Sequence, residues 1–326
     1  MKKFFKDYWL ALLAILFIIF SFFSPYIFTF PAQNQRFDFT ETGTIGDTIN
    51  GIMGPFIAIA AALLTFAAFI VQKRANDIQI ESIKKQVKKD EVASIESRIL
   101  QLINLHRENI NDLITINDKK NYNSGQDAIS DCCRTVEYII EYLETIPNEF
   151  SEKEKRIFSY LFLCHGVELA NNEYFKNQTA FSLYTESEVI DKVYKHLYNN
   201  RAIKKYLLLS ETGYINILSR YFRQLFQIIK YIDEQQILSK KEKYDYAKIL
   251  RSSLTNKEQE LLFNNILSPY GTPWVKRDND GKSYVEKYKI FKNIPTYYIH
   301  GYSPLNFMAD TFNYSESDLK DFFDTL

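Results

Sequence analysis

Two long apolar segments lie within the first 71 residues, and the rest of the 326-residue chain has none of comparable length. No charged residue occurs over residues 8–30 or over residues 51–71. An α-helix of about 20 apolar residues is long enough to cross the hydrocarbon core of a membrane, which is about 30 Å thick. The sequence therefore predicts a transmembrane hairpin over residues 1–71, with spans at about 8–30 and 51–71.

The first apolar segment shares one feature with a secretory signal peptide. Lys2, Lys3 and Lys6 form a basic leader before it. The apolar region is longer than that of a signal peptide, however, and no cleavage site with small residues two positions apart follows it. We therefore expect a span that is retained in the mature protein.

Basic residues flank the two predicted spans unequally. The basic leader precedes the first span, and only Arg36 lies between the spans. A larger group follows the second span: Lys73, Arg74, Lys84, Lys85, Lys88 and Lys89. Because Lys and Arg in short flanks stay on the cytoplasmic side of a membrane, both termini are predicted to be cytoplasmic, and membrane lipids are expected partners.

Small residues recur along one face of the second span. Gly54, Ala58 and Ala62 are four residues apart, a spacing that lets helix backbones approach closely. This face could pack against the first span or against another copy of the chain, which would make the protein a homo-oligomer. Asp47 and Thr48 are expected to cap the second span, with Pro55 in its first turns.

A long helix is predicted to follow the second span. Residues 72–111 contain neither Gly nor Pro, and their apolar residues recur at helical spacing. The register slips between Val87 and Val92, which disfavours a long uniform coiled coil. We predict a stalk helix over residues 72–115 that merges into a helical domain over residues 116–326.

His106 lies among the regularly spaced apolar residues of this helix. Two roles are open for it: a hydrogen-bonded core residue, or a ligand.

The remaining chain is predicted to be helical. Helices are expected at about 126–146, 152–171, 184–198, 212–234, 239–253 and 256–267. Capping-box patterns support three of them: Ser151 with Glu154, Ser239 with Glu242, and Thr255 with Glu258. Residues 117–125 are predicted to form a polar turn, and residues 278–281 the turn of a small hairpin. The predicted fold is all-α, with a transmembrane hairpin, a helical stalk and a cytosolic helical bundle.

Composition argues against several kinds of chemistry. Lys and Arg total 40, as do Asp and Glu, so the net charge gives no reason to expect indiscriminate nucleic-acid binding. Neither a phosphate-binding loop nor a dinucleotide-binding glycine turn is present. Cys132-Cys133 and Cys164-His165 lack the ligand spacing of zinc knuckles, so we expect buried structural thiols. No catalytic residue, metal or cofactor is predicted.

Two polar clusters remain as candidate binding surfaces. Arg220, Arg223, Gln227 and Lys230 are spaced by three or four residues, which aligns them on one helix face. This face is either solvated or a polar groove for a partner or an anionic ligand. The second cluster interleaves cations with tyrosines that could stack on bases: Lys192, Lys195, Arg201, Lys204 and Lys205 with Tyr194, Tyr198 and Tyr206.

Three stretches of the sequence share a common resemblance: residues 44–56, residues 100–109 and residues 221–233, the last continued by residues 242–251 and Leu254. Together they resemble the AbiC-like family of phage abortive infection proteins. If the helices over 212–234 and 239–253 pair as an antiparallel hairpin, the polar face that begins at Arg220 lies next to the second helix. The candidate ligand or partner site is therefore Arg220, Tyr221, Arg223, Gln227, Lys230, Tyr246, Arg251 and His106.

The resemblance implies a bacterial defence protein of the inner membrane that stops growth of an infected cell before phage progeny emerge. We expect the helical domain to sense a phage or host trigger, and the hairpin to act as a toxin-like effector by altering membrane integrity or oligomer state. Two alternatives are a membrane-tethered enzyme that acts on RNA, and a scaffold that recruits another defence component such as a retron or its nucleic acid.

Overall fold

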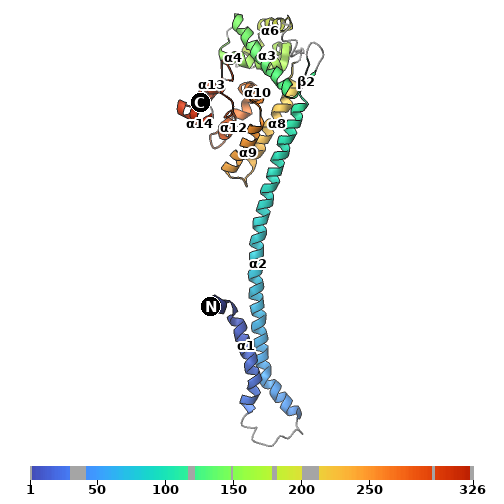
Figure 1. The fold of residues 1–326 in the computed structure, drawn as a ribbon, viewed down its shortest axis with the longest axis vertical. Helices are drawn as coiled ribbons and strands as arrows, with labels where there is room; N and C mark the ends of the chain where they lie inside the picture. Colours follow the sequence, from blue (N-terminus) through green and yellow to red (C-terminus); the bar gives the residue numbers. More distant parts are fainter. Residues whose placement is uncertain are drawn as a thin grey trace. The chain divides into compact units, whose positions relative to one another are not determined.

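The computed structural model of the chain describes residues 2–29, 42–116, 122–147, 150–177, 182–199, 213–295 and 298–323. Two compact units are present, over residues 1–91 and 92–326, and each is described by itself. The described residues form helices joined by turns and loops, together with one pair of short strands, so the prediction of an all-α fold is confirmed (Figure 1). Helix α2 (Thr42–Asn111) begins in the first unit and ends in the second.

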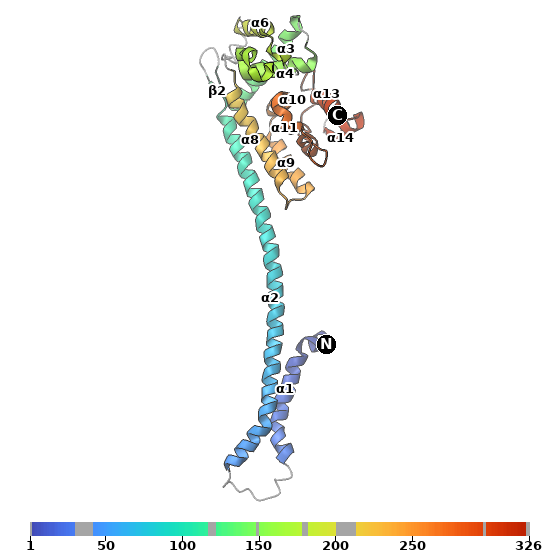
Figure 2. The ribbon, with the colours of Figure 1, turned by 180° about the vertical axis from the view of Figure 1, so that it is seen from behind.

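The first unit consists of α1 (Lys2–Thr29) and the first part of α2. Both helices contain a segment that is long and apolar enough to cross a membrane, Trp9–Ile27 in α1 and the part of α2 that starts at Ile49. The two helices lie side by side (Figures 1 and 2). Phe56 of α2 meets Phe20 of α1 edge to face, with ring centroids 4.9 Å apart, and lies 6.4 Å from the ring of Phe17.

The small residues of the second apolar segment do not face α1. Gly54, Ala58 and Ala62 are exposed, whereas Ala60 is buried. Ala60 and Phe56 each lie two positions from one of these small residues. Because a helix turns about 100° per residue, Ala60 and Phe56 are on the other side of α2. In this unit, the face of α2 with Gly54, Ala58 and Ala62 is therefore exposed, and α1 packs against the opposite face.

The prediction that Asp47 and Thr48 cap the second apolar helix is wrong, because α2 begins earlier, at Thr42. Because one helical turn precedes Asp47, the backbone amides of Asp47 and Thr48 donate to carbonyls of that turn and need no cap. Pro55 therefore lies inside the helix, where its ring conflicts with the carbonyl of Gly51 and removes one hydrogen bond. The bend of α2 near its start follows from this proline (Figure 2).

The second unit contains the end of α2 and all later elements. These are β1 (Ile114–Ile116), β2 (Tyr122–Ser124), α3 (Gln126–Thr145), α4 (Glu152–His165), η2 (Gly166–Asn171), α5 (Glu173–Lys176), η3 (Ser182–Thr185), α6 (Ser187–Asn199), α8 (Ile215–Glu234), α9 (Lys240–Ser253), α10 (Asn256–Leu267), η4 (Pro269–Gly271), α11 (Thr272–Val275), α12 (Tyr284–Tyr288), α13 (Pro304–Phe312) and α14 (Glu316–Phe322). The three predicted capping boxes are confirmed at the starts of α4, α9 and α10.

Residues 114–124 differ from the prediction. The stalk helix was expected to reach residue 115, but α2 ends at Asn111, and β1 pairs antiparallel with β2. The β-branched run from Ile114 to Ile116 favours a strand over a helix. Thr115 Oγ1 and Asn123 Nδ2 both donate to the Asp131 carboxylate of α3, at 3.1 and 2.7 Å, which anchors the strand pair to the bundle.

Two other boundaries differ from the predicted ones. A single helix was expected over 152–171, but the α-helix ends at His165 because Gly166 takes a positive φ of 57°. A hairpin was expected around the turn at residues 278–281. The turn is present, since the Gly281 amide donates to the Asp278 carbonyl, but α11 and α12 flank it instead of strands.

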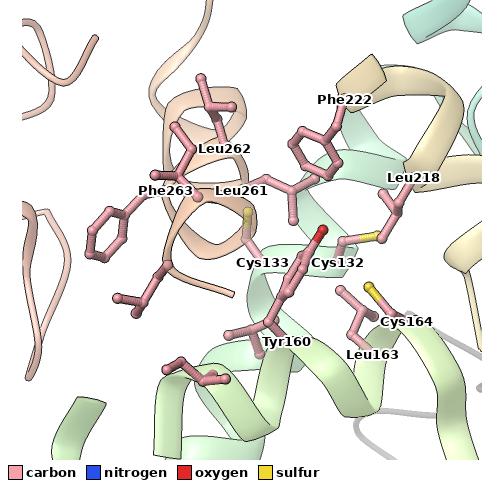
Figure 3. Close-up of a cluster of buried hydrophobic side chains, with 14 of the residues drawn as sticks. Cys132, Cys133, Tyr160, Leu163, Cys164, Leu218, Phe222, Leu261, Leu262 and Phe263 are labelled. Atoms are coloured by element: carbon pink, nitrogen blue, oxygen red, sulfur yellow. The ribbon is translucent and has the colours of Figure 1, made fainter. Parts of the chain in front are cut away.

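The core of the second unit lies where α3, α4 and α10 pack together, with α8 beside them (Figures 1 and 2). All three cysteines are buried free thiols in this core, as the sequence predicted. Figure 3 shows Cys132 and Cys164 beside Leu218 of α8, with Cys133 toward α10. Burial raises the pKa of the Cys164 thiol to about 12, so the thiols stay protonated and pack as small apolar groups.

Candidate functional site

Helix α8 carries most of the residues that the sequence singled out. Its start is fixed against the end of α4, because the Tyr214 amide donates to the Leu163 carbonyl at 3.1 Å. Gly213 precedes it with φ of 64°, and a Cβ there would come within 2.2 Å of the Cys164 carbonyl oxygen. Only glycine fits this approach. The apolar face of α8 is buried along its whole length: Leu218, Tyr221, Phe222, Leu225, Ile228, Ile229 and Ile232.

A pocket of about 390 Å³ opens beside the first half of α8. Its floor is formed by buried side chains of α4, α8, α10 and α11, and its rim by exposed or half-buried ones from α8 and the η4–α11 turn. The pocket is lined by Tyr160, Ile215, Ser219, Phe222, Arg223, Phe226, Gln227, Asn265, Tyr270, Pro273 and Trp274. We call this the α8 pocket. Its volume falls within the range of small-molecule sites, about 300–1,000 Å³.

The polar side chains of the α8 pocket have unused hydrogen-bonding capacity. Arg223 donates to its own helix, from Nε to the Ser219 carbonyl at 3.1 Å and from Nη2 to Ser219 Oγ at 3.4 Å. No carboxylate of the described residues pairs with it. Gln227 makes no side-chain hydrogen bond within the described part of the chain. Asn265 donates from Nδ2 to the Tyr160 hydroxyl at 2.9 Å.

The wall opposite α8 is held by close packing. Gly271 ends η4, and a Cβ there would come within 2.1 Å of the Ile266 carbonyl oxygen, so the turn lies directly on α10. This contact positions Tyr270 and Trp274 at the pocket. The Trp274 ring meets Phe226 edge to face at 5.4 Å, and the Tyr270 hydroxyl lies 2.5 Å from Nε2 of His165. The aromatic surfaces of the pocket are therefore preorganised.

The other side of α8 contacts the end of α2. Asn109 accepts from Arg220 Nη2 at 2.7 Å and donates to Gln224 Oε1 at 2.5 Å. His106, one turn earlier, packs its ring on Tyr221 with centroids 4.8 Å apart. We call these contacts the α2–α8 seam. Arg223 and Gln227 face the pocket, whereas Arg220 and Gln224 face the seam, so one helix contributes to both.

His106 is buried, and neither ring nitrogen has a hydrogen-bond partner of good geometry among the described residues. Desolvation lowers the pKa of His106 to about 4, although the nearby Gln224 side chain favours the charged form. The imidazole is therefore neutral at physiological pH. Tyr221, which packs on it, donates to the Glu258 carboxylate at 3.3 Å and is buried.

The structure separates the predicted site residues into groups. Arg223 and Gln227 line the α8 pocket, while Arg220, Tyr221 and His106 belong to the seam. Lys230, the last residue of the predicted polar face, lies 3.7 Å from Glu234 on the same helix and is not part of the pocket lining.

Helices α8 and α9 do lie side by side, but α9 contributes no residue to the pocket lining. Arg251 is buried and donates from Nη1 to the Lys289 carbonyl at 2.6 Å and from Nη2 to the Tyr244 hydroxyl at 3.4 Å. Its guanidinium joins α9 to the end of α12. Tyr246 is half-buried against the core.

The second predicted cluster is described only in part. Tyr194 and Tyr198 of α6 stack with ring centroids 6.0 Å apart, and Lys192 pairs with Glu188 at 2.6 Å. Lys195 lies on the same helix. Arg201, Lys204, Lys205 and Tyr206 lie outside the described residues.

A larger, more charged pocket of about 520 Å³ lies near the end of α8. It is lined by Asp233, Lys240, Lys243, Asp280, Lys282, Lys287 and Tyr288. Most of its charges are already paired: Lys287 lies 3.2 Å from Asp233 and also bonds Asp278, and Lys240 lies 3.0 Å from Asp280. The α8 pocket, with its unpaired guanidinium and aromatic floor, is the better candidate site.

Sequence reasoning missed the pocket residues outside α8. Tyr160, Asn265 and Trp274 come from α4, α10 and α11, and no local spacing joins them to Arg223. The one available signal was Gly271 before Thr272-Pro273-Trp274, a turn sequence that places an aromatic ring next to a close backbone contact.

Residues 213–299 match a family model, putAbiC, whose description is "Putative phage abortive infection protein". The resemblance stated from the sequence is confirmed over this stretch. The match begins at Gly213, whose lack of a side chain fixes the start of α8, and it includes every lining residue of the α8 pocket except Tyr160. No curated protein and no solved structure matches the chain.

Proposed function

We propose that this protein is a membrane-anchored phage abortive infection protein in which the second unit detects infection and the two apolar helices carry out the response. The match of residues 213–299 to the abortive infection family is the observation that carries the role in phage defence. The α8 pocket lies almost entirely within that stretch, which supports it as the site where the infection signal binds.

Anchoring in the bacterial inner membrane is supported by the first unit. Large apolar side chains cover the outside of both helices and would be in contact with lipid: Leu16, Ile19, Phe22, Phe23, Ile57, Phe66 and Phe69 among them. Their exposure is unfavourable in water and favourable in a hydrocarbon core. The basic flanks support the proposal that the N-terminus, the end of α2 and the second unit are cytoplasmic.

The proposed effector step is self-association of the second apolar helix. Gly54, Ala58 and Ala62 are exposed, and a Cβ added at Gly54 would meet no atom within 4 Å. This face can therefore receive a helix from another copy without rearranging α1. In lipid, such close approach is driven by van der Waals packing because apolar burial contributes little. Tighter association on infection would alter the integrity of the membrane.

The signal is proposed to pass through α8 to α2. One face of α8 lines the pocket, and the neighbouring face holds Asn109 and His106 at the α2–α8 seam. A ligand that shifts α8 changes the contacts available to the end of α2. Helix α2 also contains the second apolar segment, so it contributes residues both to the seam and to the proposed effector.

The experiment that tests this function adds bulk to the small-residue face. Cells that express the triple variant Gly54→Leu, Ala58→Leu and Ala62→Leu should lose phage protection, measured as plaque number, because the larger side chains keep helices apart. Membrane fractions should contain the variant at the wild-type amount. The matched control, Ile59→Phe with Leu64→Phe, adds bulk at exposed positions outside the Gly54, Ala58 and Ala62 face and should protect normally. Full protection by the triple variant would contradict the proposed effector step.

A further inference from the structure

We propose that the α8 pocket binds a nucleoside monophosphate. The inference rests on the proposed function of the pocket as the site that detects infection, and it names the chemical class of the signal. Three features of the pocket support it: one unneutralised cation, a set of aromatic faces and two amide groups with free hydrogen-bonding capacity.

The cation is the guanidinium of Arg223. Its Nε and Nη2 donate to Ser219, which fixes the plane of the group, and Nη1 has no acceptor among the described residues. A guanidinium offers five donors in a rigid fork that matches the oxygens of a phosphate. Because Arg223 is the one cation among the described residues that line this pocket, the charge complement is a single phosphate group.

The aromatic faces suit a planar ring. Phe222 and Trp274 lie at the floor and Phe226 at the rim, and their rings are held by edge-to-face contacts with neighbours. Bases stack on such rings whatever their identity, since every base has a π-face. A planar ring would cover apolar surface that is otherwise open to solvent at the pocket mouth, where Phe226 is half-buried.

The two amides suit the polar edge of a base. Asn265 uses Nδ2 to donate to the Tyr160 hydroxyl, and its Oδ1 accepts no hydrogen bond from a described residue. The Gln227 amide is exposed on the rim, with both its oxygen and its nitrogen unused within the described chain. A base edge presents donors and acceptors side by side, which an amide can pair with on both atoms.

The size of the pocket limits the ligand to one nucleotide. A volume of about 390 Å³ lies near the lower end of small-molecule pockets, about 300–1,000 Å³. A second phosphate would find no further cation among the lining residues that the structure describes. The ligand therefore consists of one base, one sugar and one phosphate, and the charged pocket near Asp233 is not part of the site.

Binding to the full-length protein in detergent tests the inference. Calorimetric titration with AMP, GMP, CMP and UMP should show saturable binding of at least one nucleotide. The matching nucleoside should bind at least tenfold more weakly, because it cannot use Arg223. Inorganic phosphate alone should also bind weakly, because it cannot use the aromatic floor.

Two variants assign the contacts. Arg223→Gln should weaken nucleotide binding at least tenfold and leave nucleoside binding unchanged, since only the phosphate contacts this residue. Gln227→Leu should weaken both. The control Lys230→Gln alters a cation on the same helix outside the pocket and should bind nucleotide as the wild type does. Circular dichroism spectra equal to that of the wild type establish that each variant is folded.

Two results would overturn the inference: no binding of any of the four nucleotides at millimolar concentration, or equal binding by wild type and Arg223→Gln. The proposed function is tested separately by plaque counts. Loss of protection in Arg223→Gln without nucleotide binding by the wild type would leave the pocket as the detector and reject the ligand class. Nucleotide binding that requires Arg223, with full protection by Arg223→Gln, would support the ligand class and reject the detecting role.

Discussion

His106 lies in surroundings that differ strongly from those it would have in water. Its side chain is 1% exposed, it packs on Tyr221, and its two nitrogens lack well-formed hydrogen bonds in the described structure. A buried imidazole without partners is costly to protonate because the charge cannot be solvated. The residue therefore makes the junction of α2 and α8 sensitive to acid.

The free energy of unfolding should fall as the pH drops from about 6.5 toward 4. Burial lowers the folded-state pKa of His106 from 6.5 to about 4, so the unfolded chain binds the proton more readily in this range. The stabilisation is complete above the unfolded pKa, and its loss at acid pH is on the order of 3 kcal/mol. Urea unfolding of the wild type at a series of pH values measures the slope.

His106→Phe supplies the comparison for this pH dependence. Phenylalanine keeps an aromatic ring against Tyr221 and does not titrate, so the variant should show a shallower decline. Burial also lowers the pKa of His165 and His196, so part of the slope remains in the variant. A decline as steep as that of the wild type would show that His106 does not bind the proton on unfolding in this range.

At the scale of elements, α8 joins the pocket to the seam. The structural basis is the helical repeat: residues 219, 223 and 227 share one face, while residues 220 and 224 lie about 100° further round. A ligand at Arg223 and the side chain of Asn109 thus contact the same two turns. The apolar side of α8 is packed into the core along its length, so the pocket face and the seam face belong to one closely packed helix.

Asn109→Ala should uncouple the two faces of α8. It removes the partner of both Arg220 and Gln224 while leaving every pocket residue in place. We expect phage protection to fall at least tenfold in plaque assays, with nucleotide affinity within a factor of about three of the wild type, since the pocket is intact. Asn104→Ala, the same change at an exposed position of α2, is the control. Normal protection by Asn109→Ala would argue against signalling through the seam.

The sequence was sufficient to predict elements whose signals are local. A capping box specifies its own helix start, so α4, α9 and α10 begin where Ser151, Ser239 and Thr255 indicate. The strand pair after α2 was missed because its stability depends on a distant residue, Asp131, which accepts from both strands. Short strands of this kind are marginal without such support.

The candidate site was predictable to the extent that it lies on one helix. The spacing of Arg223 and Gln227 identified one wall of the pocket. The same spacing also included Lys230 and Arg220, which are not in the pocket lining. Periodicity predicts which residues share a helix face, but it does not predict where the neighbouring elements that complete a pocket end. Tyr160 and Trp274 were out of reach, since only the packing of α4 and the Gly271 turn brings them to α8.

For the molecule as a whole, net neutrality hides an uneven distribution of charge. Basic residues gather before the first apolar segment and after the second, and the segments themselves carry none. Cytoplasmic flanks rich in Lys and Arg set the orientation of a membrane hairpin. The proposed arrangement thus places the second unit, with its pocket, on the side where phage components are made.

Protease accessibility tests this orientation. A tag at the C-terminus should survive when protease is added outside intact spheroplasts and should be digested once the membrane is lysed, because the second unit is then reachable. A cytoplasmic marker protein and an external marker protein provide the controls. Digestion of the tag in intact spheroplasts, or recovery of the full-length chain in the soluble fraction, would contradict the proposed anchoring.

The burial of Cys132, Cys133 and Cys164 also has a practical consequence. The chain has three cysteines in total, and all lie in the core with thiol pKa values raised by desolvation. Maleimides react with thiolates, which these residues do not form near neutral pH. A single cysteine engineered on the surface can therefore be labelled selectively with a fluorophore or nitroxide in the otherwise native protein, and pairs of such labels would report distances between the two units in lipid.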